Sequence, residues 1–164
     1  MNQNSQTPKT KKILFVCTGN SCRSVIAEGL MKKRLKELAK DGAVEVSSAG
    51  ISATDGGKPT ENTIKVMQEE GIDLTDFKSR FLTQELTLEA DTILVMEQMH
   101  KNYILSKTPW VARKIHMVKE FALKGNGVKI SDFDIDDPLG RPIEVYRFVK
   151  NMIKDYVYKI ADKL

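Results

Sequence analysis

Residues 13–24 read Ile13-Leu14-Phe15-Val16-Cys17-Thr18-Gly19-Asn20-Ser21-Cys22-Arg23-Ser24. The first part of this stretch is apolar and contains large and β-branched side chains, a pattern typical of a buried strand. The strand ends at Gly19-Asn20, two residue types that tolerate a positive φ, and a helical pattern starts directly afterwards. A short loop between a strand and a helix N-terminus can turn its backbone N–H groups inward. The sequence therefore predicts an anion-binding loop.

The same loop carries a candidate nucleophile. Five residues separate Cys17 from Arg23, and Ser24 follows, which gives the pattern C-x5-R-S. A helix N-terminus, converging amide groups and a guanidinium all stabilise a thiolate relative to a thiol. We therefore expect Cys17 to act as a thiolate nucleophile.

The rest of the chain alternates between apolar runs and helical periodicities. Strands are predicted at 13–17, 44–50, 91–96 and 114–118. Helices are predicted at 22–40, 60–71, 83–89, 98–106 and 142–162, with Thr60 as a cap and Pro142 at a first helical position, and 123–137 is read as a polar connection. Alternating strands and helices imply right-handed crossovers and an open parallel sheet, which binds ligands at the carboxyl ends of its strands. The strand at 13–17 delivers the anion-binding loop to that edge.

Length and composition limit the function classes. The 164 residues are enough for one core and too few for two ordinary domains. Residues 1–10 are polar and contain Pro8, so we expect a flexible N-terminal tail and a single domain over 11–164. The net charge is +4 and the lysines are scattered, which argues against a nucleic-acid partner. The two cysteines both lie in the loop, so no disulfide framework is expected.

The expected compartment also follows from the apolar pattern. No apolar run approaches the roughly 20 residues that a membrane helix needs, so no membrane partner is expected. The N-terminus lacks the apolar stretch of a signal peptide. We therefore expect a cytoplasmic protein.

A second motif lies far along the chain, just before the last predicted helix. Asp137-Pro138-Leu139-Gly140 is an ordinary turn sequence, but its loop can also bring a carboxyl group over the anion site, as a general acid requires. Asp136 precedes it and is either a second acid or a solvated neighbour.

Together the two motifs resemble the low-molecular-weight protein tyrosine phosphatase family, from about Lys12 to the C-terminus. The resemblance is carried by V-C-T-G-N-S-C-R-S at 16–24, S-S-A-G at 47–50, I-L-V-M at 93–96 and D-D-P-L-G at 136–140. It implies an open four-stranded parallel sheet with helices on both faces, a flavodoxin-like three-layer arrangement. It also implies hydrolysis of protein phosphotyrosine without metal or cofactor. Phosphorylated proteins are the expected partners, and we expect a monomer or weak dimer.

The resemblance assigns a role to each matching residue. It implies that Cys17 forms a phosphocysteine intermediate, that Arg23 grips two phosphoryl oxygens, and that Asp137 protonates the leaving group and then activates water. It further implies that Ser24 stabilises the Cys17 thiolate. The residues expected to bind phosphate are Thr18, Gly19, Asn20, Ser21, Cys22 and Arg23.

Supporting residues have alternative interpretations. Asn20 is either a turn residue or a support that bonds Ser24 and Ser48. Cys22 either forms a reversible disulfide with Cys17 or is a small buried apolar residue. Glu97 either supports the loop or solvates a helix start. His100 and His116 show no metal-ligand spacing, so we expect both on the surface or at a strand end.

Three other functions remain open. Protein arginine phosphatases resemble this chain at 114–121 and 137–146, and they carry threonine where Ser21 stands; Leu139 also removes an aromatic wall for a phenyl ring. Thioredoxin-linked arsenate reductases share the loop but relay oxidation to two further cysteines, which this chain lacks. The third is a phosphate-binding module without chemistry, which would need neither Cys17 nor Asp137.

Overall fold

The apolar run that begins at Ile13 lies in an interior strand of the sheet. The structure is a computed structural model that describes residues 9–127, 129 and 131–164, so residues 1–8 of the predicted tail lie outside the described residues. Strand β1 spans Lys11–Cys17, and its side chains alternate between two apolar cores: Phe15 faces one, Leu14 and Val16 face the other. Burial of each such side chain contributes about 1.5–3 kcal/mol to folding, which explains why the run is apolar on both faces.

The sheet has four parallel strands in the order β2-β1-β3-β4, which confirms the predicted fold class. The other strands are β2 (Val44–Gly50), β3 (Thr92–Val95) and β4 (Ile115–Met117). The chain moves outward from β1 to β2 and then returns past β1 to β3. The carboxyl ends of β1 and β3 therefore meet at the switch in strand order, where open sheets bind ligands.

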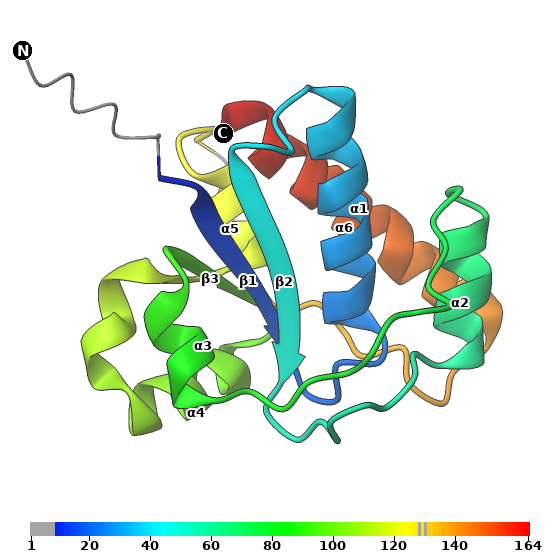
Figure 1. Ribbon diagram of the computed structural model, residues 1–164, viewed down its shortest axis with the longest axis horizontal. Coiled ribbons are helices and arrows are strands. Elements are labelled where there is room, and N and C mark those ends of the chain that lie inside the picture. Colours follow the sequence, from blue (N-terminus) through cyan, green and yellow to red (C-terminus); the bar gives the residue numbers. More distant parts are fainter. Residues whose placement is uncertain (1–8, 128, 130) are drawn as a thin grey trace, which may run out of the picture.

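Helices cover both faces of the sheet, as predicted. One face is covered by α1 (Arg23–Glu37), α2 (Glu61–Gln68), α5 (Val118–Leu123) and α6 (Ile143–Lys163). The other is covered by α3 (Gln84–Glu89), α4 (Gln98–Lys107) and the 3₁₀ helix Pro109–Lys114. Figure 1 shows α1, α2 and α6 on one side of β1 and β2, and α3 and α4 on the other.

Two local predictions need correction. Helix α5 was not predicted, because Val118 and Ala122 form too short an apolar pattern for helical periodicity to be recognised; both pack into the core beside α6. Pro142 is the N-cap of α6 and not its first helical residue: its φ is −59° and its ψ is 159°, in the extended range, and the helix starts at Ile143. Among the described residues, no helix has both the length and the apolar character needed to cross a membrane.

Candidate active site

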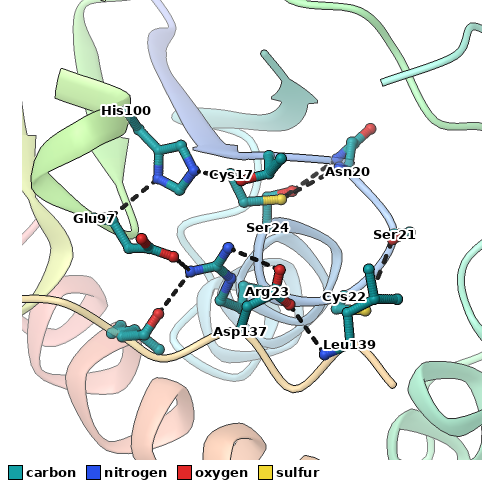
Figure 2. A network of polar contacts seen from close by, with 12 residues as sticks. Cys17, Asn20, Ser21, Cys22, Arg23, Ser24, Glu97, His100, Asp137 and Leu139 are labelled. Atoms are coloured by element: carbon teal, nitrogen blue, oxygen red, sulfur yellow. Dashed lines mark hydrogen bonds and ion pairs between the residues drawn. The ribbon is translucent and has the colours of Figure 1, made fainter. Parts of the chain in front are cut away.

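The Cys17 sulfur lies at the base of the loop between β1 and α1 (Figure 2). The Asn20 backbone N–H donates to Cys17 Sγ at 3.3 Å, and Ser24 Oγ lies 2.9 Å from the same sulfur. Ser24 Oγ already accepts a hydrogen bond from Asn20 Nδ2 at 2.8 Å, so its own proton is free to point at the sulfur. The site therefore supplies two donors to a negative charge on Cys17.

Asn20 holds the backbone of this loop in an unusual conformation. Its φ is +49°, in the left-handed region that few non-glycine residues adopt. Its side chain is buried and donates to Ser24 and to Ser48 Oγ, the latter at 2.9 Å, which are the two contacts anticipated from the sequence. Its Oδ1 accepts from the Arg80 N–H at 2.9 Å. These bonds offset the cost of the strained φ.

The end of β2 approaches the loop so closely that only glycine fits. A Cβ on Gly50 would lie 2.6 Å from the Thr18 carbonyl oxygen and 2.7 Å from the Asn20 nitrogen. The small residues that close the S-S-A-G motif therefore make room for the loop.

Arg23 is the first residue of α1, and its side chain is buried. Its guanidinium forms an ion pair with Glu97, donates to the Ile135 carbonyl at 2.7 Å, and lies 3.3 Å from Asp137 Oδ2. Asp137 thus reaches the loop from a segment 114 residues away from Arg23 in sequence. Its other carboxyl oxygen accepts the Leu139 N–H at 3.1 Å, which holds the turn. Asp136 is exposed.

His100 is buried, so the expectation that it lies on the surface or at a strand end was wrong. It sits on α4, and its Nε2 lies 2.9 Å from Thr18 Oγ1 while its Nδ1 accepts the Glu97 N–H at 3.0 Å. Burial, reinforced by the positive charge of Arg23, lowers the pKa of His100 to about 4, so the ring is neutral at pH 7. No local sequence pattern identifies this contact. His116 is half-buried on β4.

Cys22 is buried, and its sulfur lies 3.6 Å from both Thr60 Oγ1 and Tyr146 Oη. Cys17 and Cys22 are both free thiols. Burial raises the pKa of Tyr146, so its hydroxyl stays protonated at pH 7. Within the described part of the chain, no group of three or more potential ligands could hold a metal ion.

The sequence is similar to known proteins over nearly the whole chain. Residues 12–164 match the family model described as "Low molecular weight phosphotyrosine protein phosphatase". A protein-arginine-phosphatase of Geobacillus stearothermophilus is 35% identical, with 93% of this chain and 95% of the relative covered. The probable low molecular weight protein-tyrosine-phosphatase EpsP of Ralstonia nicotianae is 33% identical, with 88% and 89% covered.

A solved structure of a phosphatase with a phosphorylated active site is also similar to this chain. It is a mutant of the YwlE arginine phosphatase that carries a phosphorylated active-site serine. It shares 32% identity with this chain at a TM-score of 0.84, with 93% of this chain and 95% of that one covered.

Proposed function

Because the chain belongs to the low molecular weight phosphotyrosine protein phosphatase family, we propose that it hydrolyses phosphorylated protein side chains through a phosphocysteine on Cys17. The observation that carries this proposal is the convergence of three groups. The Cys17 sulfur, the Arg23 guanidinium and the Asp137 carboxylate come from two distant segments and meet at one loop. A phosphate-binding module would need only the loop and the guanidinium.

The first step transfers the phosphoryl group to sulfur. The Cys17 thiolate attacks phosphorus, an S–P bond forms, and the bond to the leaving group breaks while Asp137 supplies it with a proton. Backbone N–H groups from Thr18 to Arg23, with the Arg23 guanidinium, stabilise the charge on the equatorial oxygens.

The second step returns the enzyme to its starting state. Asp137 takes a proton from water, the water oxygen attacks phosphorus, and the S–P bond breaks. The departing thiolate receives hydrogen bonds from Ser24 and from the Asn20 N–H, the two donors that already reach the sulfur. Inorganic phosphate leaves, and Asp137, which gave up its proton in the first step, is protonated again.

Phosphotyrosine is the proposed substrate, and phosphoarginine is the second candidate. Two features favour the second. Ser21 places a hydroxyl on the phosphate loop, and Leu139, which is 59% exposed, stands where an aromatic wall would stack on a phenyl ring. The relative from Geobacillus is also named for arginine. Arsenate reduction by a cysteine relay is not proposed, because Cys17 and Cys22 are the only cysteines of the sequence.

The test is hydrolysis of para-nitrophenyl phosphate, followed by phosphotyrosine and phosphoarginine peptides side by side. Wild type should release phosphate. Cys17→Ser should abolish turnover, because a serine hydroxyl near neutral pH is a far weaker nucleophile than a thiolate. Normal turnover by Cys17→Ser would contradict the assignment. Tight phosphate binding without release would favour the binding module.

We also propose that residues 11–164 form one phosphatase domain that acts in the cytoplasm as a monomer or weak dimer. The continuous match over 12–164 supports the domain. Light scattering and limited proteolysis test the mass and the boundary.

A further inference from the structure

His100 takes no part in the proposed proton transfers, yet its ring is fully buried beside the phosphate-binding loop. Figure 2 shows the ring between Glu97 and the loop that carries Cys17. Thr18, which it contacts, precedes it by 82 residues. A polar ring buried at such a junction is unfavourable unless its nitrogens are bonded.

Both ring nitrogens are bonded, and the partners fix one tautomer. A backbone N–H can only donate, so the bond from the Glu97 N–H requires an unprotonated Nδ1. The proton of the neutral ring therefore sits on Nε2, which donates to Thr18 Oγ1 at 2.9 Å. A second proton on Nδ1 would bring two donors face to face.

The segment around Glu97, to which His100 is bonded, contacts both Arg23 and the residues that lead to Asp137. Glu97 pairs with Arg23 through its carboxylate. The Met96 carbonyl accepts the Ile135 N–H at 2.8 Å, and the Gln98 N–H donates to Asp134 at 2.7 Å, so the segment leading to Asp137 is anchored at the same place. One ring thus ties this junction to the first residue of the phosphate loop.

We propose that His100 is a positioning residue whose neutral ring holds Thr18 Oγ1 and the Glu97 main chain together, and so aligns the phosphate loop with Arg23. The inference rests on the proposed phosphatase function. The charged groups that face the ring are Arg23, Asp134 and Asp137, together with the Glu97 carboxylate. Burial and the charge of Arg23 disfavour an imidazolium and outweigh Asp134 and Asp137, which favour it, in agreement with the neutral tautomer.

The test compares three substitutions at this position. His100→Gln keeps an amide near the place of Nε2, His100→Asn keeps an amide oxygen near the place of Nδ1, and His100→Ala keeps neither. His116→Ala is the matched control, because that histidine lies on β4 and its ring packs at a tilt against Phe121. For each protein we would measure kcat with para-nitrophenyl phosphate, the inhibition constant of vanadate, and the folded fraction by thermal unfolding.

The proposal predicts that His100→Ala lowers kcat and raises the vanadate constant, each on the order of tenfold per folded molecule. His100→Gln and His100→Asn should fall between His100→Ala and wild type, and His116→Ala should match wild type. The proposal is overturned if folded His100→Ala keeps both constants within twofold of wild type, or if its losses only follow a smaller folded fraction.

Failure of the proposed function would look different. Wild type would then not hydrolyse the substrate at all, whereas calorimetric titration with inorganic phosphate would still report whether His100 orders the loop. A tenfold weaker phosphate affinity in His100→Ala supports the positioning role in that case, and an unchanged affinity overturns it.

Discussion

Asp137 and Arg23 form an ion pair at 3.3 Å. The proposed acid therefore contacts a guanidinium nitrogen that the substrate must also contact. Glu97 and the Ile135 carbonyl hold the Nη1 side of Arg23, while Asp137 contacts Nη2. An incoming phosphoryl oxygen therefore competes with the Asp137 carboxylate for one nitrogen.

Replacement of this carboxylate should separate binding from turnover. In Asp137→Asn we expect kcat to fall on the order of a hundredfold or more, because the proton donor is lost. The vanadate inhibition constant should fall several-fold, because a negative charge next to the oxyanion site is removed. Steady-state kinetics with and without vanadate measures both. Asp136→Asn is the control, since Asp136 is exposed; weaker vanadate binding by Asp137→Asn would contradict the competition.

At the scale of elements, the start of α2 is hydrogen-bonded to the phosphate loop. The Thr60 N–H and Thr63 Oγ1 both donate to the Ser21 carbonyl, at 3.1 Å and 2.9 Å. Thr60 caps the helix by accepting the Thr63 N–H, and Tyr146 of α6 lies 3.3 Å from the Thr60 hydroxyl. The start of α2 therefore holds one carbonyl of the loop in place, and α6 contacts the residue that caps α2.

Thr63→Val removes one of these bonds with little change of shape. We expect the free energy of unfolding to fall by about 1 kcal/mol, because the part-buried Ser21 carbonyl loses one of its two donors. We expect kcat/KM to fall a few-fold, because the loop becomes less ordered. Thr87→Val is the matched control: Thr87 is buried and bonds the Gln84 carbonyl within α3. Urea unfolding should show similar losses in both variants, and kinetics should be altered only in Thr63→Val.

At the scale of the whole molecule, buried titratable groups make stability depend on pH. The pKa of His100 is lowered from 6.5 to about 4, so between these values the unfolded chain binds more protons than the folded one. Stability is fully present above about pH 6.5 and falls as the pH drops toward 4. The shift corresponds to about 3 kcal/mol. Burial also lowers the pKa of His116, which adds a contribution of the same sign.

This dependence is measurable by urea unfolding at several pH values. Between pH 6.5 and 4.5 the free energy of unfolding of wild type should decrease, and His100→Gln should remove much of that slope because the variant cannot take up the proton. An equal slope in both proteins would show that His100 does not titrate as described.

The carboxylate of Glu70 is another group whose titration lowers the free energy of unfolding, at lower pH than His100. Glu70 is bonded to Lys150 and Lys154, each at 2.6 Å, and although burial acts in the opposite direction, these bonds lower the pKa of Glu70 below its ordinary value. A carboxylate with a lowered pKa stabilises the fold above its unfolded pKa and loses that contribution as the pH falls through the folded one. Loss of this cluster would loosen the turn that follows α2 from α6.

The sequence by itself determined the parallel sheet and the Cys17 loop, because strand and helix periodicities, and the C-x5-R-S motif, are properties of residues close together in the chain. The tertiary structure alone decided what surrounds that loop. His100 and Glu97 follow β3, and they meet Thr18 and Arg23 because the strand order places β3 beside β1. Periodicity carries no information about such contacts, since it specifies which face of an element is buried and not which distant polar group lies opposite.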